Sequence, residues 1–281
     1  MKYGVVDVGG GMRGVYAAGI FDYCLDHNIN FDTCIGVSAG SANCASYIAK
    51  QRGRNYQFYL DYAFRKEYMG LDNLIHNHAF INFDYIYDDL SGSEGENPVD
   101  YETFANNPCD FLVVATNATT GESHYFRKEE IHLNDYDTLK ASCSVPGVNP
   151  PYFVDNVPYY DGALSDCAPL TKAFEEGCDK VILILTKPIG TIRNNKKDSI
   201  LAKMFESEYP LAAKCLRERA SHYNNQVNMA RELEKRGKVL ILAPDSIEGV
   251  DTLKRNREAL KVLYVKGYRD GEKIIEFIKN N

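Results

Sequence analysis

Two short glycine-rich segments near the start of the chain have the residue types and the spacing that nucleophilic catalysis requires. Residues 36–40 read Gly-Val-Ser-Ala-Gly, a G-x-S-x-G pattern, and they lie between an apolar run and a helical pattern. At a sharp strand-to-helix turn, such a pattern holds its central serine in a strained conformation at the edge of a sheet. Ser38 is therefore the candidate nucleophile, and Gly36 and Gly40 are the small neighbours that let strand and helix approach each other.

The other segment, residues 9–14, reads Gly-Gly-Gly-Met-Arg-Gly and also joins a predicted strand to a predicted helix. Its glycines let backbone N–H groups approach a negative charge at a helix N-terminus. That charge is either the pyrophosphate of a dinucleotide, since Gly9, Gly11 and Gly14 satisfy G-x-G-x-x-G, or the oxyanion of an acyl-transfer intermediate. A dinucleotide site needs an acidic residue after the second strand, where this chain has the serine turn. The acyl-transfer interpretation is therefore favoured.

A serine nucleophile needs a proton acceptor, and no histidine downstream of Ser38 lies in a small-residue turn at a strand end. The downstream histidines belong to aromatic, polar or helical patterns instead: His76, His78, His124, His132 and His222. A carboxylate is then the expected base, and Asp161 is the candidate because it opens an Asp-Gly-Ala turn. Asp155 and Asp166 are nearby alternatives, which we interpret as structural or solvated residues. An ordinary turn aspartate is the competing interpretation of Asp161.

Alternating strands and helices must position these turns. Continuous apolar runs predict strands that are covered on both faces over 3–9, 34–38, 110–118, 180–187 and 238–244. Helical patterns follow over 12–28, 39–53 and 251–281. This alternation predicts an α/β fold of three layers, α/β/α, around a central, mostly parallel sheet. Adjacent parallel strands would bring both glycine turns to the same carboxyl edge.

The order of three motifs, GGGMRG, GVSAG and DGA, resembles the patatin-like phospholipase family. Similar blocks extend over 111–122 and 141–170, so the resemblance covers at least residues 3–187. It implies a Ser–Asp dyad with Ser38 as nucleophile and Asp161 as base. The resemblance further implies an oxyanion hole and a set of supporting residues: Gly9, Gly10 and Gly11 for the hole, and Arg13, Gly14, Gly36, Gly40 and Gly162 in support. Arg13 would support the glycine loop or attract an anionic head group.

From this resemblance we expect a serine acyl hydrolase that cleaves carboxylic esters of lipids, namely phospholipid, lysophospholipid or acylglycerol. No metal and no diffusible cofactor are implied. Two other classes stay open: a non-catalytic lipid-binding protein on the same fold and, least favoured, a dinucleotide-binding oxidoreductase. We expect one patatin-like domain over 1–281, with the core motifs in 3–187 and a helical and strand extension over 188–281.

The composition of the chain limits which classes of partner and which cellular compartment we expect. The net charge of −7 argues against nucleic-acid binding and against broad adhesion to anionic membranes, although transient contact with a membrane surface stays open. No apolar run reaches the length of a bilayer span, and the first residues lack a signal-peptide pattern. The eight cysteines include no C-x-x-C pair and predict reduced, mostly buried thiols in a cytoplasmic protein. The sequence carries no signal for an oligomeric state.

The segment 55–90 concentrates tyrosine and phenylalanine. Tyrosine offers an apolar body with a polar tip, which suits a surface that meets both lipid and water. The segment therefore predicts a lid, the wall of an acyl pocket, or plain packing against the flank of the sheet.

Overall fold

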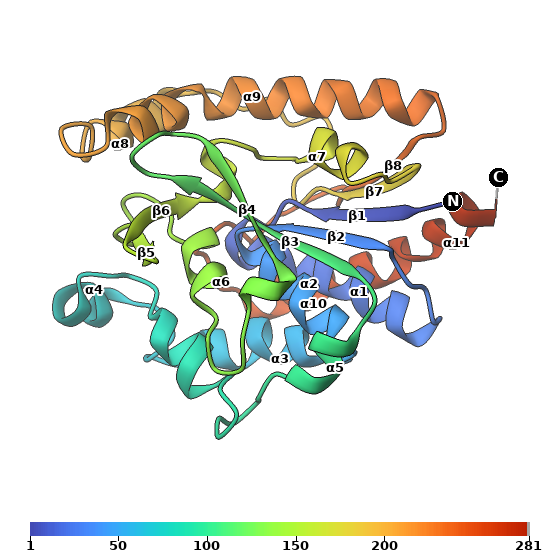
Figure 1. Cartoon of the computed structure of the whole chain (residues 1–281), viewed down its shortest axis with the longest axis horizontal. Coiled ribbons are helices and arrows are strands. Elements are labelled where there is room, and N and C mark those ends of the chain that lie inside the picture. Colours follow the sequence, from blue (N-terminus) through green and yellow to red (C-terminus); the bar gives the residue numbers. More distant parts are fainter. Residues whose placement is uncertain (280–281) are drawn as a thin grey trace.

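The computed structural model describes residues 1–279, in which eight strands form one mixed sheet (Figure 1). The order is β5-β6-β3-β2-β1-β7-β8, and β4 pairs with β3 outside this path. The strand bounds are β1 Tyr3–Asp7, β2 Thr33–Val37, β3 Asp110–Asn117, β4 Ser123–Arg127, β5 Tyr152–Val154, β6 Val157–Asp161, β7 Lys180–Ile184 and β8 Val239–Leu242. Strands β3, β2, β1, β7 and β8 run parallel, whereas β4 and β6 run antiparallel to β3. The predicted mostly parallel sheet is confirmed.

Helices cover both faces of this sheet (Figure 1). Helices α1, α2, α3 and α10 lie on one face, and α7 and α9 lie on the other. The helix bounds are α1 Val15–Asp26, α2 Ala39–Ile48, α3 Arg54–Leu60, α4 Leu71–Asn77, α5 Tyr101–Asn106, α6 Asp137–Ser142, α7 Leu170–Glu175, α8 Lys196–Ala202, α9 Pro210–Lys235, α10 Arg257–Asp270 and α11 Glu272–Lys279. The predicted three-layer α/β/α arrangement is confirmed.

The central strands are apolar along their whole length because both of their faces are covered. Successive residues of β1 illustrate this, since Val5 packs into the core on the α1 side and Val6 into the core on the α9 side. Both side chains are at most 1% exposed. A strand in this position needs no polar face, so its sequence shows a continuous apolar run.

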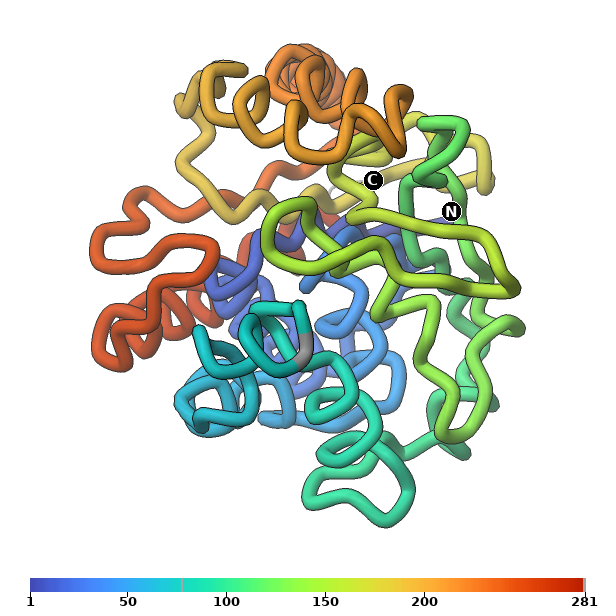
Figure 2. The backbone as a smooth tube through the Cα atoms, turned by 90° about the vertical axis from the view of Figure 1, so that its left-hand side faces the viewer, coloured from blue at the N-terminus to red at the C-terminus, as the bar shows by residue number. Residues whose placement is uncertain are grey.

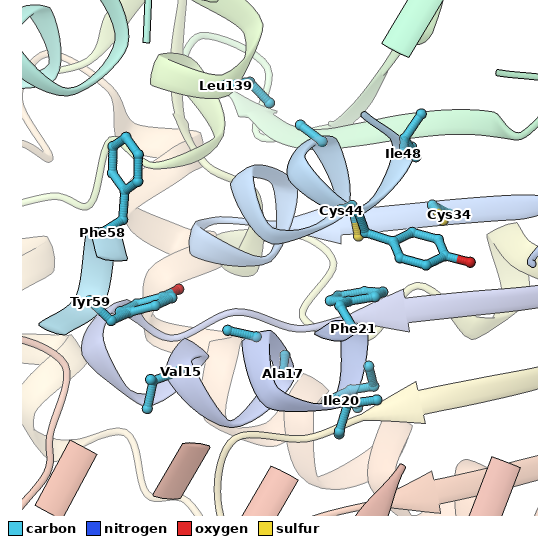
Figure 3. Packing of buried hydrophobic residues seen from close by; sticks show 14 of the residues in the cluster. Val15, Ala17, Ile20, Phe21, Cys34, Cys44, Ile48, Phe58, Tyr59 and Leu139 are labelled. Atoms are coloured by element: carbon cyan, nitrogen blue, oxygen red, sulfur yellow. The ribbon is translucent and has the colours of Figure 1, made fainter. Parts of the chain in front are cut away.

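Helices α1 and α10 touch backbone to backbone. A Cβ atom on Gly19 of α1 would overlap the carbonyl of Tyr264, and one on Gly267 of α10 would overlap the carbonyl of Tyr16. On the other side of α1, Phe21 lies close to Cys44 of α2 (Figure 3), and its ring centroid is 5.0 Å from that of Tyr47 on the same helix as Cys44. Helix α1 is therefore clamped between the sheet, α2 and α10, which fixes the glycine loop that leads into it.

The C-terminal part of the chain completes the same sheet and the same layers. Strand β8 pairs in parallel with β7, and α10 packs on α1. We therefore propose that the chain forms one domain, as predicted over 1–281. Residues 280–281 lie outside the described range. Among the described helices, none combines the length and the apolar composition needed to cross a bilayer.

Candidate active site

Ser38 lies where β2 turns directly into α2. Its backbone has φ 56° and ψ −134°, and such a conformation costs a residue with a Cβ atom on the order of 1–3 kcal/mol. A Cβ atom on Gly36 would overlap the Cα of Ser41, and one on Gly40 would overlap the carbonyl of Asp7. These two glycines therefore lie where the strand and the helix come closest. The side chain of Ser38 lines a cavity although the residue is only 8% exposed.

Strand β1 pairs in parallel with β2 and brings the glycine loop to the same sheet edge. Gly9, Gly10 and Gly11 have φ values of 61°, 118° and 60°, and a Cβ atom on Gly9 would overlap the carbonyl of Val37. The Gly9 N–H donates to Asp7 Oδ1 at 2.9 Å. Within residues 1–279 the N–H groups of Gly10 and Gly11 have no such acceptor. Two donors of this loop are thus available to a ligand.

A buried network joins the loop to α2, and the sequence analysis missed it. Asp7 is fully buried and accepts a hydrogen bond from Asn43 Nδ2 at 2.9 Å. The same amide donates to the carbonyl of Gly14 at 3.0 Å, and Tyr59 donates to Asn43 Oδ1 at 3.2 Å. Burial raises the pKa of Asp7 to about 6, against the hydrogen bonds from Asn43 and Gly9. A Cβ atom on Gly14 would overlap the Tyr59 hydroxyl, so this glycine admits the tyrosine.

Arg13 ties the glycine loop to a distant segment. The residue is 4% exposed, and its Nη1 donates to Asp251 Oδ1 at 2.7 Å and to Thr252 Oγ1 at 2.8 Å. The N–H of Met12 donates to the Thr252 carbonyl at 2.9 Å. Burial lowers the pKa of Arg13 to about 10, and Asp251 opposes that change. The charge of Arg13 is therefore neutralised within the protein, and its side chain supports the loop.

Asp161 ends β6 and caps the short helix η5, Gly162–Leu164. Its Oδ1 accepts the N–H of Ala163 at 2.8 Å, and the residue is 2% exposed. Burial raises the pKa of Asp161, while hydrogen bonds from the Ser38 side chain and from the Ala163 N–H oppose the rise. A Cβ atom on Gly162 would overlap the backbone of β3. The structure thus brings the predicted nucleophile and the predicted base into contact.

Strand β3 is what brings Ser38 and Asp161 together. It pairs with β2 as far as Val37 and Val114, and it pairs with β6 from Ala115 and Asp161 onward. Strand β4 pairs along one edge of β3, so β2 and β6 share the opposite edge. On that edge β6 begins to pair where the pairing with β2 ends. The residue that follows Val37 therefore meets the last residue of β6.

Ser142, at the end of α6, fills the junction between β2 and β6. Its hydroxyl donates to the carbonyl of Val114 at 2.6 Å and accepts the N–H of Ser38 at 2.9 Å. Ser142 was not predicted from the sequence, because a serine next to another small residue gives no signal until its partners are known. Its full burial makes both hydrogen bonds costly to lose.

A cavity of about 540 Å³ opens at this edge of the sheet, which faces the viewer in Figure 2. Ser38, Asp161, Gly10 and Gly11 line it. One part of its wall is largely apolar and comes from the aromatic segment: Phe58, Tyr59, Tyr68, Met69, Ile81, Phe83, Ile86 and Tyr87. Another part, which we call the cationic wall, consists of Arg13, Lys187, Arg193, Lys197 and Arg219. The segment 55–90 therefore supplies pocket wall as well as core.

The other candidates for a base lie elsewhere. The downstream histidines are all exposed, and none lines the cavity: His76, His78, His124, His132 and His222. Asp155 is exposed in the turn between β5 and β6. Asp166 is buried and accepts hydrogen bonds from Tyr125 at 2.6 Å and from Gln226 at 2.5 Å. The interpretation of Asp155 and Asp166 as solvated and structural residues is therefore confirmed.

The eight cysteines are unpaired in the described chain, and six of them are buried. Among residues 1–279 no group of three or more His, Cys, Asp or Glu side chains is arranged to hold a metal ion. The prediction of mostly buried thiols is therefore confirmed.

The fold and the site define the class, an α/β protein whose ligand cavity lies at the carboxyl edge of its parallel strands. Residues 8–174 match the family model described as patatin-like phospholipase, so the chain belongs to this family of lipid hydrolases. Residues 209–281 match a second model, described as a domain of unknown function, DUF6363.

Two named proteins show how far this similarity reaches. The chain is 25% identical over 192 residues to the uncharacterized protein YjjU of Escherichia coli strain K12, an alignment that covers 66% of this chain and 52% of that protein. The chain thus spans about half the length of this relative. The crystal structure of VipD from Legionella pneumophila superposes with a TM-score of 0.50 at 13% identity, over 98% of this chain and 67% of that one. This likeness concerns the fold.

Proposed function

We propose that this protein is a serine acyl hydrolase that cleaves the carboxylic ester bonds of phospholipid, lysophospholipid or acylglycerol. The observation that carries the proposal is that the Ser38 side chain lies beside the buried carboxylate of Asp161, close enough to affect its pKa, in the wall of one cavity. Membership of a family of lipid hydrolases supports the substrate class.

In the first step, Ser38 Oγ attacks the ester carbonyl while Asp161 takes the hydroxyl proton. The N–H groups of Gly10 and Gly11 donate to the oxyanion of the tetrahedral intermediate. Collapse of the intermediate breaks the ester C–O bond, and Asp161 returns its proton to the departing alcohol. We assign no donor role to Gly9, which the sequence analysis had included, because its N–H is already bound by Asp7.

In the second step, Asp161 takes a proton from water as the water oxygen attacks the acyl group on Ser38. The bond between the carbonyl carbon and Ser38 Oγ then breaks, the proton returns to Oγ, and the fatty acid leaves. A carboxylate is ordinarily a weak base, and the burial that raises the pKa of Asp161 makes it a better proton acceptor. Asp161 carries every proton, so the cycle uses no metal and no diffusible cofactor.

A fluorophosphonate probe, which reacts with activated serines, tests the proposal together with para-nitrophenyl esters of increasing chain length. The native protein should label and hydrolyse the esters, Ser38→Ala should lose both properties, and Asp161→Asn should lose hydrolysis. A folded native protein that neither labels nor hydrolyses any ester would overturn the proposal and favour the lipid-binding alternative.

The dinucleotide-binding alternative has less support. It needs an acidic side chain at the end of the second strand, where β2 is followed by Ser38. It also gives the contact between Ser38 and Asp161 no role. Stabilisation of the protein by NAD or NADP in a thermal-shift titration would favour this alternative.

We also propose transient contact between the cavity rim and a membrane surface. Helix α4 exposes Leu71 and Ile75, each 69% exposed, and α8 exposes Ile200 to the same extent. The loop between α6 and β5 joins the two helices, since Phe80 donates its N–H to the Val148 carbonyl at 2.8 Å and Gly147 abuts Leu201. A lipid surface is the partner that would cover scattered apolar side chains around the mouth of a lipid site.

A cytoplasmic location is likewise a proposal, supported by eight unpaired and mostly buried cysteines, which suit a reducing compartment. Fractionation of cells that express the protein with a small tag would test the location.

A further inference from the structure

The two ends of the cavity wall differ in chemistry. The aromatic segment gives an apolar wall, which suits an acyl chain, whereas the cationic wall brings together five positive side chains. The chain as a whole has a net charge of −7. A cluster of cations inside the cavity of an acidic protein points to a ligand with negative charge.

Two members of the cationic wall are neutralised by the protein itself. Arg13 pairs with Asp251 at 2.7 Å. Arg219 forms a two-pronged pair with Asp198, at 2.6 and 3.0 Å. These arginines hold the wall together and have little charge to offer to a ligand.

Lys187 is not neutralised. It follows β7 at the same sheet edge as Ser38, is half-buried, and lines the cavity. Within residues 1–279 its Nζ has neither a carboxylate nor a hydrogen-bond acceptor in contact. Burial and the neighbouring charges of Arg193 and Arg13 lower the pKa of Lys187 to about 8. The protein thus holds a cation in an environment that disfavours it.

Arg193 is a second cation of the wall that is partly buried and has no carboxylate partner in the described chain; Lys197 also has none there, but its side chain is exposed. Its guanidinium stacks on the ring of Tyr223 at 3.6 Å from the centroid, and its Nε has no hydrogen-bond acceptor. The main chain of Arg193 exchanges two hydrogen bonds of 3.0 Å with the side chain of Asn224. Arg193 is therefore fixed in place before any ligand arrives, which lowers the entropy cost of binding.

We propose that Lys187 and Arg193 form a subsite for the phosphate monoester of a lipid substrate, such as lysophosphatidic acid, whose acyl chain lies against the aromatic segment. The proposal rests on the proposed function, because the phosphate belongs to the alcohol that leaves the acyl carbon when the acyl group stays on Ser38. A phosphate monoester carries about −1.5 to −2 charges at neutral pH, which suits the two partly buried cations that the protein leaves without a carboxylate. A phosphocholine head group brings its own cation, which the wall repels, and a neutral glycerol offers no charge.

The test compares three substrates with the same oleoyl chain: lysophosphatidic acid, lysophosphatidylcholine and monoacylglycerol. Para-nitrophenyl butyrate reports on the chemical step without a head group. The variants are Lys187→Met, Lys187→Arg and Arg193→Gln, and the matched control is Lys214→Met, whose lysine is exposed on α9 away from the cavity. Because Lys187 has no ion-pair or hydrogen-bond partner in the described chain that the substitution would leave unpaired, the Tm of Lys187→Met should be no lower than that of the native protein.

We expect the native protein to prefer lysophosphatidic acid. One charged hydrogen bond is worth about ten- to hundredfold, so Lys187→Met should lower kcat/KM for lysophosphatidic acid by about that factor. The variant should change kcat/KM for monoacylglycerol and para-nitrophenyl butyrate less than about twofold, Lys187→Arg should restore most of the loss, and Arg193→Gln should act like Lys187→Met. Equal loss on all substrates, or no preference of the native protein for lysophosphatidic acid, would overturn the subsite.

Two further arms separate the explanations. If inorganic phosphate inhibits the native protein as strongly as an alkyl phosphate of matched chain length, the site recognises the free ion, and the lipid assignment fails. If para-nitrophenyl butyrate is not hydrolysed at all, the proposed function fails, whereas hydrolysis without head-group preference removes only the subsite.

Discussion

The hydroxyl of Ser142 accepts the backbone N–H of Ser38 across 2.9 Å, although the two residues are 104 positions apart in the sequence. The same oxygen donates to the carbonyl of Val114 at 2.6 Å. The main chain of the proposed nucleophile is thus held by a side chain from α6 at the point where β2 ends. The strained turn is stabilised from outside.

Ser142→Ala should therefore affect stability and activity together. The variant leaves a buried N–H and a buried carbonyl without their partner, at a cost of about 1–3 kcal/mol in the free energy of unfolding. We expect kcat for para-nitrophenyl esters to fall by about tenfold, because the serine turn loosens by a fraction of an ångström. Ser144→Ala is the control, since its hydroxyl donates to the Lys140 carbonyl at 2.9 Å and touches neither strand end. A loss of stability with full activity in both variants would contradict the positioning role.

Gly9→Ala should lower the free energy of unfolding by more than the positive φ of this position alone explains. A Cβ atom there overlaps the Val37 carbonyl, and neither backbone can move without displacing the serine turn. Gly53→Ala is the matched control, because Gly53 has φ 80° but open space around it. Urea denaturation should show a loss of about 1–2 kcal/mol for the control, the cost of the left-handed conformation, and a clearly larger loss for Gly9→Ala. Equal losses would show that steric overlap has no part in the effect.

The buried carboxylate of Asp7 should leave a signature in the pH dependence of stability. Its pKa is raised from 3.8 to about 6 in the folded protein, so the native state keeps the proton longer than the unfolded chain. The stabilisation from protonated Asp7 is fully present below about pH 4. The free energy of unfolding should then fall by about 3 kcal/mol as the pH rises to about 6. Asp7→Asn should lack this decline in equilibrium unfolding between those pH values. The control is Asp155→Asn, which removes an exposed carboxylate from a turn; the same change of slope in both variants would rule out Asp7 as the source.

The activity on lysophosphatidic acid should fall at alkaline pH. Lys187 faces Arg13, Arg193 and Arg219, with Asp251 as the opposing charge, and its pKa lies at about 8. It loses its charge as the pH rises through that value, so kcat/KM for the phosphate-bearing lipid should decline there while kcat/KM for monoacylglycerol does not. In Lys187→Arg the decline should move to higher pH. Parallel profiles for the two substrates would argue against a charged Lys187 at the head group.

The exposed apolar residues of α4 should matter only when the substrate is part of a lipid surface. The double variant Leu71→Ser, Ile75→Ser removes two side chains, each 69% exposed, and should weaken binding to vesicles by about tenfold through lost apolar burial. Vesicle sedimentation and hydrolysis of para-nitrophenyl butyrate would be measured side by side, and the second should stay unchanged. Val262→Ser on α10, which removes a side chain that is 70% exposed, serves as the control. Unaltered sedimentation of the double variant would exclude α4 from membrane contact.

The central strands could be predicted closely because burial on both faces leaves an unmistakable apolar run. The predicted strand over 34–38 is β2 Thr33–Val37, and the one over 110–118 is β3 Asp110–Asn117. The strands β4, β5 and β6 were not predicted, since partly exposed strands do not produce such runs.

Helix ends were predicted less well than strands. The prediction of one helix over 39–53 is wrong, because α2 ends at Ile48 and Gly53, at φ 80°, precedes α3. The helical run predicted over 251–281 begins only at Arg257 and is divided at Gly271. A glycine lies at a helix boundary in both places, since Gly53 precedes α3 and Gly271 separates α10 from α11.

Some residues of the candidate site were predictable from the sequence and others were not. Ser38 and the glycine loop were visible in the sequence because the backbone there admits only certain residues. Asp7, Ser142 and Lys187 were not visible, because each matters through a partner, or the lack of one, that the folded sheet decides. A single buried serine or lysine has no meaning in a sequence until its surroundings are known.

The cavity is built from two stretches of chain, and only one of them lies within the residues that match the family model. Ser38, Asp161 and the glycine loop lie within residues 8–174, which match the family model, whereas Lys187, Arg193 and Arg219 lie beyond it. If the proposed function holds, substitutions in the later stretch would change which lipid head group the protein selects and would leave the reaction at Ser38 unchanged.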